Sequence, residues 1–176
     1  PAQKGYLDVY HHYGLTGQRS VFAHCVHLED AEWQCMHETD SAIAFCPTSN
    51  LFLGSGLFPL NKTWQQQVKV GLGTDVGAGT SFSLLQTVNE AYKVQQLQGD
   101  KLSAYESLYH ATLGGAKALD LDNKLGNFNV GKEADFVVLN LKPTALQQLR
   151  QSRAKSLEDS LFALFTMGDD RNIEAT

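Results

Sequence analysis

Short apolar runs alternate with amphipathic stretches in the first half of the chain. Three runs have the apolar, partly β-branched character of buried strands, at residues 21–23, 42–45 and 69–72. The stretches between them place apolar residues at helical spacing, so that Trp33 and Met36 would face inward from one helix and Leu60 and Trp64 from the next. This alternation predicts βαβ units, and therefore three adjacent parallel strands in chain order.

The second half begins with helical patterns. Residues 82–97 and 103–119 predict two amphipathic helices, and an S-x-x-E capping box opens the second of them. Gly114 and Gly115 lie inside that second helix, where each weakens a helix by about 1 kcal/mol relative to alanine. We therefore expect these glycines to pack closely against another backbone.

Residues 126–141 then interrupt the helical pattern. They contain a turn at Gly131 and a β-rich run at 136–139 with no helix between, which predicts a hairpin or a small antiparallel sheet. A last helix is predicted over residues 157–167, where Gly168 ends it.

Two polar side chains stand where predicted strands end. His24 directly follows the first run, and Asp75 follows the third, ahead of a glycine-rich turn at residues 76–79. Ligands and metals bind at the carboxyl ends of strands in parallel α/β proteins, so both residues are candidates for the site. The alternatives are structural: a buried histidine bonded to backbone, and an aspartate that caps the turn or the next helix.

Other polar residues near these strand ends are weaker candidates. Residues 47–50, Pro-Thr-Ser-Asn, follow the second run and are expected to form a loop over the site, on the rim of the pocket. His27 is interpreted as a loop residue, because an H-x-x-H spacing outside a helix does not aim both rings at one point. His11 and His12 are adjacent in a short predicted helix and are expected on the surface.

The composition is that of an ordinary globular chain. Its 176 residues suffice for one domain with a core, and 43% are hydrophobic. A net charge of −5 argues against a nucleic-acid surface, and no apolar run approaches the roughly 20 residues of a membrane span. Cys25, Cys35 and Cys46 form no C-x-x-C pair, which argues against a disulfide framework and a cysteine-bound zinc. We expect a reduced, cytoplasmic enzyme without nucleic-acid or membrane partners.

Five motifs occur in the order in which the amidohydrolase superfamily carries them. They are FAHC (22–25), CPTSN (46–50), GLGTD (71–75), ATLGGA (111–116), and GNF through GKEAD (126–135). The chain therefore resembles this superfamily over almost its whole length, from about Gly5 onward. Within it the chain is most similar to the bacterial enzymes that act on guanine, and GDDRNI at 168–173 is the most specific piece.

The resemblance implies an α/β fold: the C-terminal part of a (β/α)8 metallo-hydrolase barrel with part of a small β-sandwich. Residues 1–122 would supply the last strands and helices of the barrel. Residues 123–145 would form a β-sandwich segment, and residues 146–176 the C-terminal helix and the start of a truncated sandwich strand. A whole barrel needs about 250 residues, so the chain is expected to be incomplete. Its start at Pro1 without a methionine suits a cut or processed N-terminus.

The resemblance also implies one zinc ion, with Asp75 as a metal ligand and catalytic residue and His24 as a second catalytic residue. Family members complete the zinc site with an H-x-H pair and a further histidine, and a glutamate shuttles protons. This sequence contains no H-x-H and lacks those upstream elements. Catalytic zinc normally has at least three protein ligands, so we expect weak or absent zinc binding by this chain alone.

The implied reaction is hydrolytic deamination of guanine to xanthine and ammonia, a step of purine catabolism. Zinc-bound water ionises near pH 7, which would supply hydroxide to attack C2 of guanine. Asp75 would accept the water proton, and His24 would stabilise the charge developing on the attacking oxygen.

Two alternatives stay open at the level of sequence. One is a sister amidohydrolase that acts on another aminated or chlorinated heterocycle, because the substrate contacts of the family lie mostly upstream. The other is an inactive fragment that only folds or assembles. The free edge of a partial barrel predicts self-association into a homo-oligomer, or association with the missing N-terminal part.

Overall fold

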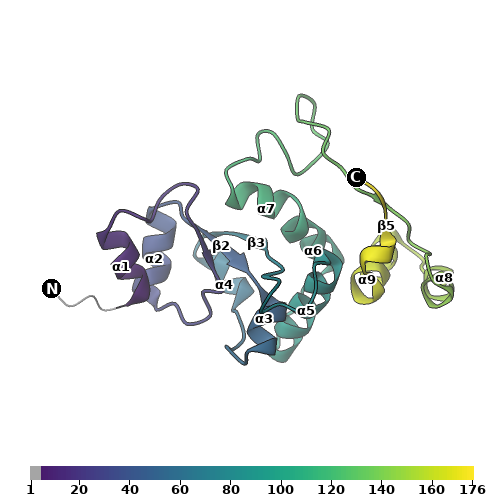
Figure 1. Ribbon diagram of the computed structural model, residues 1–176, viewed down its shortest axis with the longest axis horizontal. Coiled ribbons are helices and arrows are strands. Elements are labelled where there is room, and N and C mark those ends of the chain that lie inside the picture. Colours follow the sequence, from purple (N-terminus) through teal and green to yellow (C-terminus); the bar gives the residue numbers. More distant parts are fainter. Residues whose placement is uncertain (1–4) are drawn as a thin grey trace.

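A three-stranded parallel sheet forms the centre of the computed structural model, which describes residues 5–176. Its strands are β1 (Val21–Ala23), β2 (Ala42–Phe45) and β3 (Lys69–Leu72), in the spatial order β1-β2-β3 (Figure 1). The three predicted strands are therefore confirmed in position, order and direction. The expectation drawn from Pro1 lies outside the described residues.

Helices join and cover the strands. Before β3 they are α1 (Tyr6–His12), α2 (Asp30–Glu38), α3 (Pro47–Phe52) and α4 (Leu60–Gln65). After β3 they are α5 (Leu84–Leu97), α6 (Ala104–Ala111), α7 (Leu113–Ala118), α8 (Ala145–Gln151) and α9 (Leu157–Met167). Figure 1 shows α1 and α2 on one side of the sheet, α5 to α7 on the other, and α8 and α9 farther out. Within the described residues, no helix has the length and apolar character that crossing a membrane requires.

The hydrophobic core lies around β2 and α2. Ile43 and Phe45 of β2 are fully buried, and Phe58 packs on Phe45 with the ring centroids 4.8 Å apart. Trp33 and Met36 are buried from α2, as the sequence predicted. Each such side chain contributes about 1.5–3 kcal/mol when buried, so this cluster stabilises the sheet and fixes where its strands end.

The sequence predicted that Leu60 and Trp64 of α4 both face the core, and this is confirmed for Leu60 only. Leu60 is buried, but the side chain of Trp64 is 52% exposed. Trp64 lies over Tyr109 and His110 of α6, with ring centroids 5.6 and 5.7 Å away. Trp64 therefore packs on α6 and stays partly exposed to solvent.

The helix predicted over residues 103–119 breaks into α6 and α7 at Thr112, whose φ of −132° and ψ of −95° are not helical. The break allows α7 to lie directly on β3. A Cβ added to Gly71 would stand 2.7 Å from the Cα of Gly115, closer than any side chain tolerates. The expected close packing of the glycines is confirmed, and it requires a residue without a side chain at Gly71.

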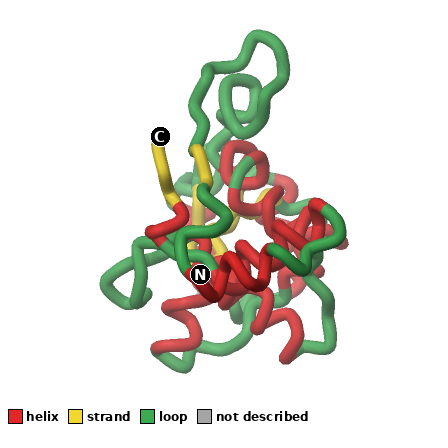
Figure 2. The backbone as a smooth tube through the Cα atoms, turned by 90° about the vertical axis from the view of Figure 1, so that its right-hand side faces the viewer, coloured by secondary structure: helices red, strands yellow, loops and turns green. Residues whose placement is uncertain are grey.

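A second, small sheet joins the end of the chain to an earlier segment. β4 (Val138–Leu139) pairs antiparallel with β5 (Ile173–Ala175). The predicted small antiparallel sheet is confirmed, but the hairpin is wrong because β5 comes from the last residues of the chain. The helix predicted over 157–167 is confirmed as α9, whereas α8 was not predicted. Residues 119–137 run as an irregular loop away from the sheets (Figure 2).

The GDDRNI run has a structural role here. Asn172 ends the short 3-10 helix η1 (Asp170–Asn172) and is buried. Its Oδ1 accepts hydrogen bonds from the Asp169 amide at 3.0 Å and Gln147 Nε2 at 3.1 Å, while its Nδ2 donates to the Asn140 carbonyl at 2.7 Å. One side chain thus connects α8, the end of α9 and the residue that follows β4.

His110 is a buried titratable residue in α6. The side chain is 1% exposed, and neither ring nitrogen makes a hydrogen bond, although the Val70 carbonyl lies close enough to favour the charged ring slightly. Desolvation lowers the pKa of His110, opposed in part by that carbonyl and by the Glu106 carboxylate. The ring is therefore held neutral in the folded chain.

We expect His110 to make the fold acid-sensitive. The unfolded chain takes up the proton near pH 6.5, whereas the folded chain takes it up only at lower pH. The free energy of unfolding should therefore fall below pH 6.5, by up to about 1.4 kcal/mol per pH unit until the folded pKa is reached. In urea denaturation at pH 7 and pH 5, His110→Leu should lose this difference, whereas the exposed-histidine control His12→Asn should keep it. An unchanged pH dependence in His110→Leu would contradict the prediction.

Candidate active site

The two candidate side chains meet at the carboxyl ends of the strands of the parallel sheet. His24 follows β1 directly, and Asp75 follows β3 by three residues. Their side chains approach with His24 Nε2 3.7 Å from Asp75 Oδ2, and they are 42% and 37% exposed. The fold thus brings a half-exposed imidazole and a half-exposed carboxylate together from positions 51 residues apart in sequence (75 − 24).

His24 and Asp75 both have unusual backbone conformations with positive φ. His24 has φ of 69° and Asp75 has φ of 46°, in the left-handed region that non-glycine residues seldom adopt. The His24 amide donates to the Ala44 carbonyl at 3.0 Å, and the Gly79 amide donates to the Asp75 carbonyl at 2.6 Å. These two backbone hydrogen bonds stabilise the turn of the chain that follows each strand. Such conformations concentrate at functional sites, where surrounding structure maintains them.

A cluster of paired charges lies at the other end of the strands, the amino end. Lys69, at the start of β3, binds Asp40 at 3.0 Å and Asp120 at 2.6 Å through its Nζ. The Asp120 carboxylate also accepts from the Arg19 amide at 3.0 Å. These charges pair with one another, which suits a stabilising role at the amino ends of the strands.

A third polar side chain joins the pair from α3 (Pro47–Phe52), the helix that follows β2. Residues 47–50 were predicted to form a loop, but the structure contradicts this: they begin α3, with Pro47 in the first turn. Proline at the start of a helix is favourable because its missing N–H has no helical partner there, and this signal was available in the sequence. The helical turn carries Asn50 beneath His24, where Asn50 Oδ1 lies 2.8 Å from His24 Nδ1.

The rim position predicted for Thr48, Ser49 and Asn50 is also wrong, because all three residues are buried. Ser49 Oγ donates to the Cys46 carbonyl at 3.2 Å. The other histidine predictions hold. His11 and His12 are exposed on α1, and His27 lies in a loop, where its ring bonds the Ser55 carbonyl at 2.9 Å.

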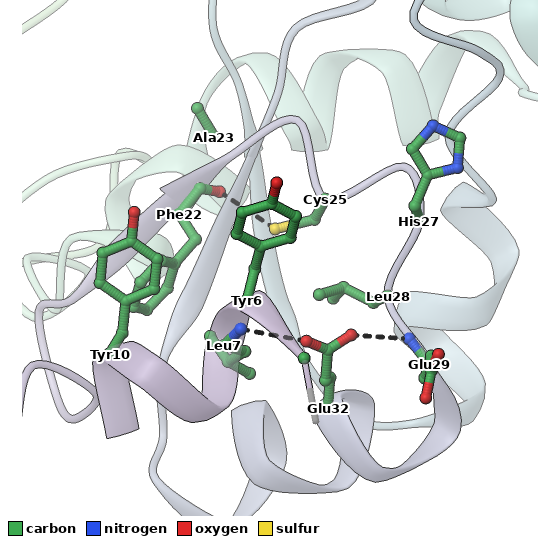
Figure 3. A pocket seen from close by; sticks show the side chains of 11 residues that line it. Tyr6, Leu7, Tyr10, Phe22, Ala23, Cys25, His27, Leu28, Glu29 and Glu32 are labelled. Atoms are coloured by element: carbon green, nitrogen blue, oxygen red, sulfur yellow. Dashed lines mark hydrogen bonds between the residues drawn. The ribbon is translucent and has the colours of Figure 1, made fainter. Parts of the chain in front are cut away.

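A recess of about 640 Å³ lies beside this site, along β1, without including the candidate pair. Figure 3 shows its lining side chains, with Tyr6 and Tyr10 from α1 and Phe22 from β1. The Glu32 carboxylate lies at its base, where it accepts from the Leu7 amide at 3.0 Å and thereby joins α1 to α2. The recess is mostly apolar and follows the unpaired side of β1, so it has the character of an uncovered packing surface.

A family model described as the amidohydrolase family matches residues 2–176. The chain belongs to the amidohydrolase family. The fold described above is thus the α/β amidohydrolase fold, present in part.

Known amidohydrolases resemble this chain closely. Guanine deaminase of Escherichia coli (strain K12) is 66% identical over 176 residues, which are 100% of this chain and 40% of that protein. A solved structure of E. coli guanine deaminase superposes with a TM-score of 0.95 at 67% identity, covering 97% of this chain and 40% of that one. A guanine deaminase from C. acetobutylicum with bound guanine has a TM-score of 0.84 at 31% identity, covering 97% and 41%. This amidohydrolase chain therefore spans about 40% of the length of the relatives it matches.

One more distant amidohydrolase structure contains a metal. An adenosine deaminase from Xanthomonas campestris with bound zinc has a TM-score of 0.79 at 27% identity, covering 95% of this chain and 37% of that one. In the present chain, His24 and Asp75 offer the nitrogen and oxygen donors that zinc accepts. Among residues 5–176, no three histidine, cysteine or acidic side chains gather as a metal site would require. The residues present thus fit one part of a zinc site.

Proposed function

We propose that this amidohydrolase chain is the C-terminal part of a zinc-dependent guanine deaminase, which hydrolyses guanine to xanthine and ammonia. The observation that carries the proposal is the 66% identity to E. coli guanine deaminase along the whole chain. The pairing of His24 and Asp75 at the carboxyl ends of the strands supports it, because metal-assisted hydrolysis requires side chains that hold the metal and move a proton at one place.

The proposed architecture follows the same relationship. Residues 1–122 would contribute strands and helices to the barrel, residues 123–145 a segment of the β-sandwich, and residues 146–176 the C-terminal helix and a sandwich strand. The parallel sheet β1-β2-β3 supports the first assignment, and the antiparallel pair of β4 and β5 supports the presence of a separate small sheet.

Asp75 and His24 would divide the chemistry between them. Zinc, when bound, supplies hydroxide at neutral pH by lowering the pKa of its water to about 7. Asp75 would hold the ion through its carboxylate and accept the proton that the water releases. His24 would hydrogen-bond the attacking oxygen through Nε2, the ring nitrogen that faces Asp75, and so anchor that oxygen while it attacks C2 of guanine.

Guanine is favoured over other heterocycles by the graded similarity of the solved structures. The TM-score is 0.95 for E. coli guanine deaminase and 0.79 for the X. campestris adenosine deaminase, with identities of 67% and 27%. The GDDRNI run favours guanine as a sequence motif and not through a contact with the site, since Asn172 bonds to Gln147 and Asn140.

The partner of this chain would be the remaining part of the same enzyme or a second copy. Within the described residues β1 pairs only with β2, so its other side offers unpaired backbone groups. The recess along β1 adds an uncovered apolar surface at the same place. Edges of this kind bind another strand or chain.

A reducing, cytoplasmic setting agrees with the cysteines. Cys25, Cys35 and Cys46 are all free thiols. Burial raises the pKa of Cys25 to about 12 and that of Cys46 to about 11, so both stay protonated and unreactive.

A chimera tests the proposed function. In it, this chain replaces the matching 40% of E. coli guanine deaminase, which then supplies the parts that the chain lacks. With zinc added, the purified chimera should convert guanine to xanthine and ammonia, followed by chromatography of the purines. The E. coli enzyme serves as the positive control. A folded, zinc-loaded chimera that forms no xanthine would contradict the proposal, because the residues of this chain would then not complete a guanine deaminase site.

A further inference from the structure

His24 would be poorly oriented without Asn50. The His24 side chain is 42% exposed, and its backbone is in the left-handed region. Asn50, by contrast, is 1% exposed and is fixed in α3. The contact of 2.8 Å between His24 Nδ1 and Asn50 Oδ1 therefore connects a half-exposed side chain to a buried residue of α3.

The same contact favours one of the two neutral tautomers of His24. A carbonyl oxygen only accepts, so the hydrogen bond places the proton of neutral His24 on Nδ1. The lone pair of Nε2 is then directed to the side of Asp75, whose Oδ2 lies 3.7 Å away. Asn50 Nδ2 is buried without a hydrogen-bond partner, so among the described residues the Asn50 side chain makes its hydrogen bond to His24.

We propose that Asn50 is a positioning residue that fixes the orientation and tautomer of His24. The proposal rests on the proposed function for its effect on activity, since it assigns to Nε2 the role of accepting a hydrogen bond from the attacking water or hydroxide. This role replaces the charge stabilisation expected from the sequence, because stabilising negative charge would need a proton on Nε2. Asn50 itself touches neither metal nor substrate in this scheme. It acts through Nδ1, in the way that outer carboxylates and amides orient catalytic histidines.

Substitutions of Asn50 in the chimera distinguish the contribution of its hydrogen-bond acceptor from that of its side-chain volume. Asn50→Leu is nearly isosteric and removes the acceptor, so kcat should fall on the order of 10- to 100-fold with little change in KM. Asn50→Asp keeps an acceptor and should restore most of that loss. Asn50→Ala gives a second test of acceptor removal if the leucine variant does not fold. Gln95→Leu is the matched control, because Gln95 is a buried amide with one partnered and one unpartnered atom far from His24 in the chain.

A spectroscopic readout makes the test independent of turnover. In chimera labelled with ¹⁵N-histidine, the His24 signals are identified by their loss in His24→Gln. They should show a protonated Nδ1 in the parent, in Asn50→Asp and in Gln95→Leu, and a mixture of tautomers in Asn50→Leu. Failure of Asn50→Asp to restore kcat, or an unchanged tautomer in Asn50→Leu, would overturn the proposal. A parent chimera that does not deaminate guanine would overturn the proposed function instead, while the nitrogen signals still test Asn50.

Discussion

Asp75→Asn should abolish xanthine formation by the chimera. Asparagine keeps the shape of the side chain but loses the negative charge that binds zinc and the basic oxygen that accepts the water proton. The left-handed backbone at this position tolerates asparagine, and the bond from the Gly79 amide to the residue 75 carbonyl is unaffected. The loss in kcat should therefore exceed the roughly 100-fold cost of losing an outer partner of a metal ligand.

A second aspartate provides the control for this substitution. Asp100 lies in the turn between α5 and α6, away from the sheet edge, and Asp100→Asn makes the same chemical change there. It should leave kcat, KM and bound zinc at the parent values. Initial rates of guanine consumption and the zinc content of the purified protein measure both variants. Near-parental turnover in Asp75→Asn would show that another residue holds the metal.

The 176-residue chain alone should form no xanthine and should bind zinc weakly. It carries the pair His24 and Asp75, whereas catalytic zinc takes three protein ligands. The free side of β1 and the recess beside it should drive association with another chain. We expect oligomers of the isolated chain in analytical ultracentrifugation.

Complementation distinguishes an incomplete enzyme from an inactive one. Adding the part of E. coli guanine deaminase that this chain does not match should yield a complex of defined stoichiometry and restore xanthine formation. The same mixture made with the Asp75→Asn chain should form the complex without activity. Xanthine production by the purified chain, with zinc and no other protein present, would contradict the proposed division of the site.

The linear pattern was sufficient for elements that an apolar run or a capping residue marks in the sequence. Apolar β-branched runs located β1, β2 and β3 to the residue, and the spacing of helices between them determined the parallel direction. The last helix was also predicted with its bounds, because Ser156 accepts from the Asp159 amide and fixes its start. Family motifs drew attention to His24 and Asp75, whose roles remain proposals.

The helix boundaries that failed depend on packing partners remote in sequence. The predicted helix over 103–119 breaks at Thr112 because Gly115 must approach Gly71 on β3, and this contact is not encoded within the helix itself. The loop predicted over residues 47–50 became the first turn of α3. There, Pro47 was interpreted only as the end of a strand, although proline also suits the first turn of a helix.

The sequence by itself determined the strand-helix order, the parallel sheet and the two residues at its carboxyl edge. Only the tertiary structure decided that β4 pairs with the last residues of the chain, that Asn172 connects the small sheet, and that Asn50 reaches His24. The physical reason is the range of the interactions. Period and capping act over a few residues, whereas a buried amide chooses its partner only after separate strands have come together, 26 residues apart in the case of Asn50 and His24.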